Sequence, residues 1–208
     1  LGAYITEQAQ VRTHTLFDGL HYEKQRSDVG GELSGTSLED FVQRGADDRL
    51  SPHILVDMNR FAADPLARFL EYISKSYPSP EEVSPCALFD PRQFCGGDAS
   101  KWAGAAPNLL WAHMIEGTKR FSDPHPFISV DHIARSHEDV LKASTSILET
   151  IVGGYFKGDT HPLIRATHIS EQAPWLESSG MSATQYFTEY GVAHNVDPHP
   201  YFSIQYYL

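Results

Sequence analysis

The chain has 208 residues, of which 41% are hydrophobic, 21% charged and 12% aromatic. This is the composition of a globular protein large enough to bury a core, and it excludes disordered and membrane-spanning classes. The formal net charge of −11, without any cluster of lysine and arginine, disfavours binding to nucleic acid.

The sequence carries no sign of a membrane span or an export signal. It has no run of 18 apolar residues, and its first ten residues lack both a basic leader and an apolar core. Leu1 in place of methionine suggests a segment of a longer protein. Cys86 and Cys95 have no C-x-x-C companion, so we expect two reduced thiols and neither a disulfide framework nor a zinc knuckle.

A helical pattern, apolar-x-x-apolar-apolar-x-x-Gly, occurs six times from the first residue onward. Apolar positions at i, i+3 and i+4 predict one buried face. The copies begin at Leu1, Leu38, Leu66, Leu110, Ile147 and Thr184. Preferred N-cap residues stand two positions before five of them, namely Thr36, Asp64, Asn108, Thr145 and Ser182. We expect a left-handed glycine to end four of them, at Gly45, Gly117, Gly154 and Gly191. We refer to these elements as second helices.

A ten-residue segment of the form "PHPLFD" plus four residues lies between successive second helices and also ends the chain. Its six copies, which we call corners, occupy 13–22, 52–61, 85–94, 124–133, 160–169 and 198–207. Column two holds His14, His53, Cys86, His125, His161 and His199. Columns four and five are apolar in every copy and predict a buried pair. Column six, mostly Asp or Ser, predicts the N-cap of a short first helix, and column ten is again apolar.

These two alternating patterns predict an all-α protein built as tandem helical repeats of about 37 residues, stacked in an elongated or gently curved array. One unit has too few apolar residues to close a core alone, so neighbouring units must share theirs. We expect residues 1–208 to form a single array, with the second helix of a truncated unit starting at residue 1.

Several stretches resemble a divergent bacterial helical repeat whose units read N-P-L-x-x-Y-L-x-x-G followed by P-H-P-L-F-D-x-x-Y-Y-L. They are "ADPLARFLEY" from Ala63, "PCALFDPRQF" from Pro85, "DPHPFISVDHI" from Asp123 and "VDPHPYFSIQYYL" from Val196. That repeat accompanies glycosyltransferases and other proteins of cell-surface polysaccharide synthesis. It brings no catalytic residues that match positions of this chain.

The resemblance implies a non-catalytic scaffold or interaction segment of a larger bacterial polysaccharide-biosynthesis protein, cytoplasmic or peripheral to the membrane. Its partners would be flanking catalytic domains or a separate protein, with a glycan as a further possibility and without nucleic acid. One alternative is a carbohydrate- or protein-binding module. A second alternative is a metal-dependent enzyme that uses the repeated histidines.

Eleven histidines invite a metal hypothesis, but eight of them recur in columns two and nine of the corners. A zinc ion needs ligands that converge on one point, whereas residues repeated about every 37 positions are spread along an array. We therefore predict structural imidazoles and no cofactor, and we keep His125, His161 and His199 as the metal candidates. Trp102, Trp111 and Trp175 are the candidates for stacking on sugar rings, against the alternative of core packing.

Overall fold

The computed structural model describes residues 14–74, 78–104, 106–117, 119, 122–143 and 146–206. Within these ranges the chain is helical and forms no β-strand, and its extended pairings are isolated bridges inside the corners. The predicted all-α class is confirmed. None of the helices in this part of the chain is long and apolar enough to cross a membrane.

The helices are short and follow the two predicted patterns. First helices are α2 (Gly19–Asp28), the 3-10 turn η2 (Met58–Arg60), α5 (Pro91–Cys95), α7 (Val130–Ser136), α10 (Ala166–Gln172) and the 3-10 turn η6 (Ile204–Tyr206). Second helices are α3 (Ser37–Asp40), α4 (Pro65–Ile73), α6 (Leu109–Ala112), α9 (Ile147–Val152) and α12 (Ala183–Tyr186). The connectors add the 3-10 turn η3 (Ala99–Trp102), α8 (Glu138–Ala143) and α11 (Leu176–Ser179). The second helix expected from Leu1 lies outside the described residues.

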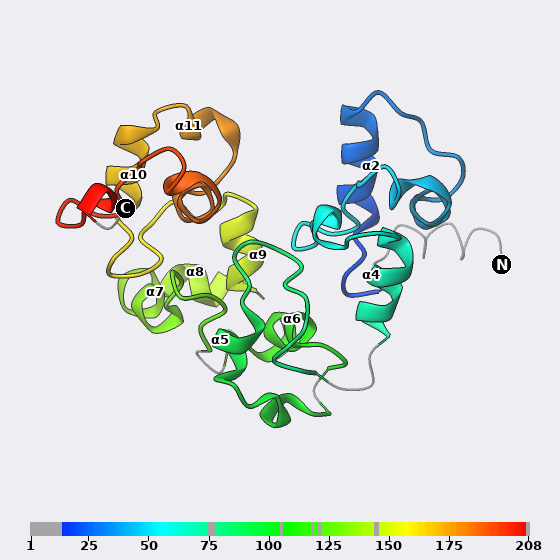
Figure 1. Cartoon of the computed structure of the whole chain (residues 1–208), viewed down its shortest axis with the longest axis horizontal. Helices are drawn as coiled ribbons and strands as arrows, with labels where there is room; N and C mark the ends of the chain where they lie inside the picture. Colours follow the sequence, from blue (N-terminus) through cyan, green and yellow to red (C-terminus); the bar gives the residue numbers. More distant parts are fainter. Residues whose placement is uncertain are drawn as a thin grey trace.

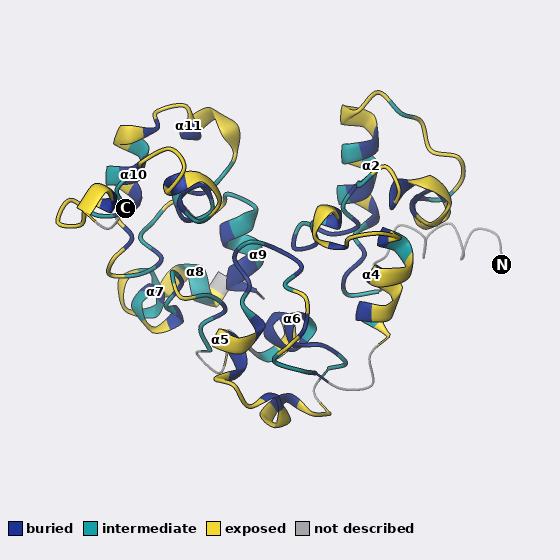
Figure 2. Ribbon diagram, viewed as in Figure 1, coloured by how far each residue is buried: buried dark blue, intermediate teal, exposed yellow. Residues whose placement is uncertain are grey.

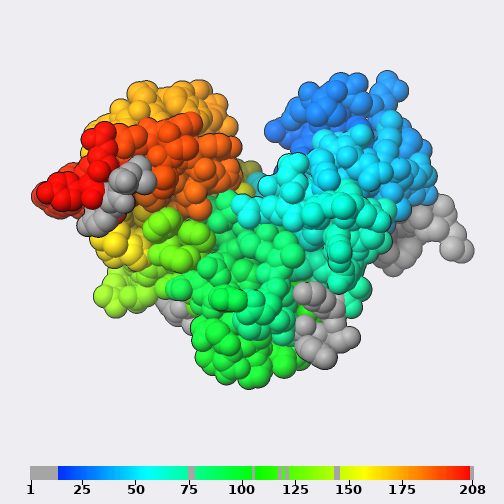
Figure 3. Space-filling model, viewed as in Figure 1, coloured from blue at the N-terminus to red at the C-terminus, as the bar shows by residue number. Residues whose placement is uncertain are grey.

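The first and last elements lie at opposite ends of the long axis of the molecule (Figure 1). Figure 1 shows α2 and α4 at one end, α5 and α6 in the middle and α10 and α11 at the other end. In the space-filling view the two ends form lobes separated by a notch (Figure 3).

First helices start where column six predicts, because a side chain accepts hydrogen bonds from their free amides. Asp18 accepts from the amides of Leu20 and His21, and Asp57 and Asp90 cap η2 and α5 in the same way. Arg165, the column-six residue of the fifth corner, makes no such bond. Asp159, which lies just before the corner, caps the helix instead: its carboxylate accepts a hydrogen bond from the amide of Ala166 at 2.8 Å.

An aspartate just before the corner also accepts a helix amide in the fourth and sixth corners. Asp123 accepts the amide of Val130 and Asp197 accepts the amide of Ile204, both at 2.7 Å. An aspartate before the corner therefore serves the three copies that lack one in column six. The sequence prediction placed the cap correctly in four corners and missed this second position.

Second helices begin at the predicted caps, with one shift. Thr36, Asp64, Asn108 and Ser182 each accept a backbone amide. Thr145 lies outside the described residues, and the cap of α9 is Ser146.

The predicted left-handed glycine is present at Gly154, with φ +70°, but not at Gly45 or Gly191. Instead α3 and α12 continue into π-turns, η1 (Phe41–Gly45) and η5 (Phe187–Gly191). The left-handed residues follow later, at Arg49 with φ 61° and Asn195 with φ 53°. Glycine at position 45 is required for a different reason, because a Cβ there would collide with the ring and hydroxyl of Tyr22.

The buried hydrophobic residues of the described chain form two clusters (Figure 2). The larger cluster takes in the first four corners and the second helices up to α9, and the smaller one holds Ile164, Ile169 and residues of α11 and α12. Column ten is buried as predicted in its five described members, Tyr22, Phe61, Phe94, Ile133 and Ile169; Tyr207 lies outside the described residues. The predicted buried pair of columns four and five holds in the first three corners. It is wrong for the sixth corner, where Tyr201 and Phe202 are exposed, and half wrong for the fifth, where Leu163 is exposed and Ile164 is buried.

Candidate functional site

Each histidine of column two closes its own corner. Its Nδ1 atom accepts the amide two residues further on at 3.1–3.2 Å, and its carbonyl accepts the amide three residues further on. This geometry holds at His14, His53, His125, His161 and His199. Since Nδ1 is an acceptor, the ring proton of the neutral imidazole must sit on Nε2.

Successive corners are joined by one backbone hydrogen bond each. The column-six amide donates to the column-one carbonyl of the following corner at 2.7–2.8 Å. The five bonds run from Asp18 to Pro52, Asp57 to Pro85, Asp90 to Pro124, Ser129 to Thr160 and Arg165 to Pro198. The series thus includes the third corner, in which Cys86 replaces the histidine. There the hydroxyl of Ser84 donates to the carbonyls of Cys86 and Phe89.

The metal candidates His125, His161 and His199 lie in three different corners. In the described part of the chain no three His, Cys, Asp or Glu side chains gather closely enough to hold a metal ion. Burial lowers the pKa of His125 to about 4, although Asp90 acts in the opposite direction. Burial also lowers the pKa of His161, reinforced by His132. A depressed pKa keeps these imidazoles neutral at pH 7, as their acceptor role requires.

Two column-two histidines reach helices far along the chain. The ring of His14 meets the ring of Trp111 edge to face with centroids 4.6 Å apart. His53 is buried, and its Nε2 lies 3.2 Å from Oε1 of Glu149. These contacts hold two corners against second helices.

The three tryptophans differ in exposure. Trp102 is buried and stacks on Phe94 with ring centroids 4.4 Å apart, so its face is not open to a glycan. Trp111 is half-buried against His14. Trp175 is 49% exposed and packs edge to face on Tyr186. Among these candidates, Trp175 alone presents a substantial free surface.

Neither cysteine has the character of a nucleophile. Cys86 and Cys95 are both buried and free. Burial raises the pKa of the Cys86 thiol to about 12, which keeps it protonated at neutral pH.

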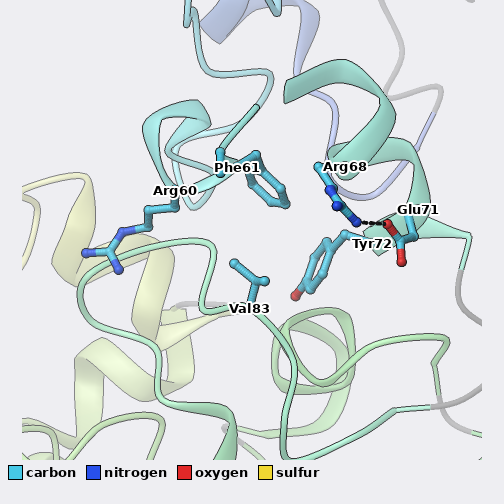
Figure 4. Close-up of a pocket in the computed structure, with 7 residues that line it drawn as sticks. Arg60, Phe61, Arg68, Glu71, Tyr72 and Val83 are labelled. Carbon is cyan, nitrogen blue, oxygen red and sulfur yellow. Dashed lines mark hydrogen bonds and ion pairs between the residues drawn. The ribbon is translucent and has the colours of Figure 1, made fainter. Parts of the chain in front are cut away.

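A pocket of about 310 Å³ lies between η2, α4 and the loop at 78–84. Phe61, Tyr72 and Val83 face one another across it, and Arg68 lies beside them with its guanidinium 2.9 Å from the carboxylate of Glu71 (Figure 4). Arg60 lines the other edge and turns away from the centre (Figure 4). The pocket therefore has two buried aromatic residues, Phe61 and Tyr72, behind an exposed hydrogen-bonding rim of Arg68 and Glu71.

A buried ion pair in the N-terminal lobe was not anticipated from the sequence. The carboxylate of Asp40 accepts hydrogen bonds from Nε of Arg26 at 2.9 Å, from Nε of Arg44 at 2.7 Å and from the hydroxyl of Tyr22. Burial alone would raise the pKa of Asp40, but hydrogen bonds from Tyr22, from the amide and hydroxyl of Ser34 and from Arg44 hold this pKa well below its usual range. Burial and the hydrogen bond to Asp40 raise the pKa of Tyr22 to about 12. The network stabilises the fold and exposes no reactive group.

His113 was also missed, although it occupies an apolar slot of its second helix. It is completely buried between Phe89 and Phe94, and neither ring nitrogen has a hydrogen-bond partner in the structure. Burial lowers its pKa to about 4, against the opposing charge of Glu149. The signal in the sequence for this buried imidazole was a histidine at an apolar position of the helical pattern.

Comparisons with protein-family models, with curated proteins and with solved structures find no match.

Proposed function

We propose that this chain is a non-catalytic helical-repeat scaffold, in which units of about 37 residues stack into a curved array and hold neighbouring domains or a partner at a fixed spacing. The setting proposed is a larger bacterial protein of polysaccharide biosynthesis, next to glycosyltransferase domains. This setting depends on the sequence resemblance alone.

One observation supports the scaffold most directly. Five corners use the same imidazole-to-amide bond, and five backbone hydrogen bonds run from each corner to the next. A side chain that is committed to holding a turn cannot also bind a metal through the same nitrogen. In this proposal the histidines hold the turns, and the backbone hydrogen bonds join each corner to the next.

The experiment has two parts. Incubated with nucleotide-sugar donors and acceptor sugars, the purified chain should consume no donor; transfer by this chain alone would contradict the proposal. Fluorophores attached at Lys24→Cys in α2 and Ser178→Cys in α11 should label these two positions alone, because both native cysteines are buried. The efficiency of energy transfer between them should have one narrow distribution that stays constant in urea below the unfolding midpoint. A broad or drifting distribution would show that the array is not a rigid spacer.

A second candidate function, binding of a small carbohydrate, is favoured by the pocket in Figure 4. Its volume is at the lower end for ligand sites. Phe61 and Tyr72 are buried behind the pocket, and the exposed pair of Arg68 with Glu71 offers donors and acceptors for sugar hydroxyls. Calorimetric titration with mono- and disaccharides tests this. Arg68→Ala should weaken binding about tenfold, while Arg135→Ala, which breaks an exposed pair elsewhere, should leave it unchanged.

A further inference from the structure

In the first two corners, column two contacts the third of the second helices that follow, counted along α3, α4, α6, α9 and α12. His14 contacts Trp111 in α6, and His53 contacts Glu149 in α9. Both partners are the third residue after the N-cap of their helix. In the third corner the same rule pairs Cys86 with Gln185, the third residue after the cap of α12.

The third corner has a pocket where the second corner has a side-chain contact. Cys86 and Gln185 both line this pocket, whose volume is about 210 Å³. At the corresponding place in the second corner, the longer side chain of His53 is buried and lies 3.2 Å from its partner. Column two holds an imidazole in every corner except the third, where it holds a shorter thiol. The pocket therefore takes the place of a missing imidazole ring.

The wall of this pocket is rich in hydrogen-bond acceptors. Asp57 of the second corner and Glu189 of η5 line it together with Gln185. Asp57 faces Arg60 at 3.7 Å in a pair that is partly exposed on both sides. Glu189 accepts the side-chain amide of Gln185 at 3.1 Å, and no basic side chain of the described residues lies within ion-pair distance of it. Two carboxylates and one guanidinium leave the pocket with an excess of negative charge.

The thiol of Cys86 makes the pocket unsuitable for a metal ion. Its sulfur accepts the amide of Leu88, the same local bond that the histidines make through Nδ1. Cys86 is 6% exposed, and burial raises the pKa of its thiol to about 12, so the thiol keeps its proton. A protonated thiol does not bind metals, and the described chain holds no cluster of three metal-binding side chains. Within the same residues the thiol proton has no acceptor, so it is free to face a ligand.

We propose that this pocket binds a small planar organic cation with N–H donors, of the size of an imidazolium or guanidinium group, in place of the imidazole that the third corner lacks. The N–H groups of the ligand donate to Asp57 and Glu189, and the ligand lies between Cys86 and Gln185. The volume is below the range of pockets that hold drug-sized molecules, which fits an occupant of this size. The bound cation joins the third corner to α12, as His53 joins the second corner to α9. The inference goes beyond the proposed scaffold and does not depend on its setting.

Titration of the full 208-residue chain with imidazole at pH 6, followed by NMR, tests the inference, because the probe is a cation at this pH. The backbone amide of Leu88 and the side-chain amide of Gln185 should shift and saturate, with a dissociation constant of about 1 mM. Pyrazole has a ring of the same size but stays neutral, and it should give no saturable shift. Absence of a shift with imidazole, or equal shifts with pyrazole, would overturn the inference.

Two substitutions locate the binding in this pocket. Cys86→His places a ring in the pocket and should abolish binding while keeping the corner bond, as in the other five corners. Glu189→Gln should weaken binding about tenfold, and because Glu189 is exposed, this variant gives an answer even if Cys86→His does not fold. Glu138→Gln, which breaks an exposed pair with Lys142 elsewhere, should leave binding unchanged. Binding that survives Cys86→His or Glu189→Gln in a folded variant contradicts the inference.

Discussion

His53 lies at ion-pair distance from Glu149, with 3.2 Å between Nε2 and Oε1, although the two residues belong to units far apart in the sequence. The opposite ring nitrogen, Nδ1, accepts the amide of Leu55. One side chain therefore closes a local turn and also ties that turn to a distant helix. This double role makes His53 the most informative position of its column.

His53→Ala should lower the free energy of unfolding by about 2–4 kcal/mol, because it removes a buried ring, a corner bond and the contact with Glu149. His199→Ala is the matched control. It removes the same corner bond at a position that has no distant helix against it, and it should cost about 1 kcal/mol. Urea unfolding measures both, and equal losses would show that the distant contact contributes nothing.

Stability should decrease as the pH is lowered from about 6.5 to about 4, because burial lowers the pKa of His113 to about 4. Between these values the unfolded imidazole is protonated and the folded one is not, so the unfolded state binds more protons. The full effect of one such residue is about 3 kcal/mol. His113→Leu should make the free energy of unfolding depend less on pH in this range. It should lower stability little at pH 7, since the His113 ring has no hydrogen-bond partner in the structure. Thermal unfolding across the range tests it, and unchanged slopes would contradict the prediction.

Asp40→Asn should destabilise the N-terminal lobe by about 2–4 kcal/mol, since the buried guanidinium of Arg26 loses its buried carboxylate partner and keeps only Asp48, which is half exposed. Glu81→Gln provides the control, because it breaks an ion pair with Arg92 that is exposed on both sides and should change stability immeasurably. Chemical denaturation distinguishes them. A similar effect of both substitutions would mean that the burial of Arg26 is not maintained in solution.

Gly45→Ala should cost at least about 2 kcal/mol, because the added methyl group overlaps the buried ring and hydroxyl of Tyr22. Gly97→Ala is the comparison: its φ is +79° but its Cβ would meet open space, so only backbone strain of about 1 kcal/mol is expected. If Gly97→Ala were the more damaging substitution, glycine at position 45 would not be explained by close approach.

The patterns that depend on local chemistry could be predicted from the sequence. Caps such as Asp18 and Asn108 act on amides within three residues, and the corner histidines recur in one column, so repetition revealed them. The π-turns that place Arg49 and Asn195 in the left-handed region could not be predicted from glycine alone, because a helix end also depends on what packs against it.

Features of the candidate site that depend on distant parts of the chain were not available from the sequence. The contact of His53 with Glu149 and the burial of Arg26 with Asp40 both require knowing which units come together. The exposure of Tyr201 could not be predicted from its column either, since the same column is buried at Leu16 and Leu55. A periodic sequence shows that units are alike, but it does not show which of them are covered.

If the repeated imidazoles hold the corners through Nδ1, nitrogen-15 NMR of the histidine rings at pH 7 will show it. We predict the neutral tautomer with the proton on Nε2 for His14, His53, His125, His161 and His199, unchanged by addition of Zn²⁺ or EDTA. Protons on Nδ1, or shifts of several of these rings at one equivalent of Zn²⁺, would contradict it.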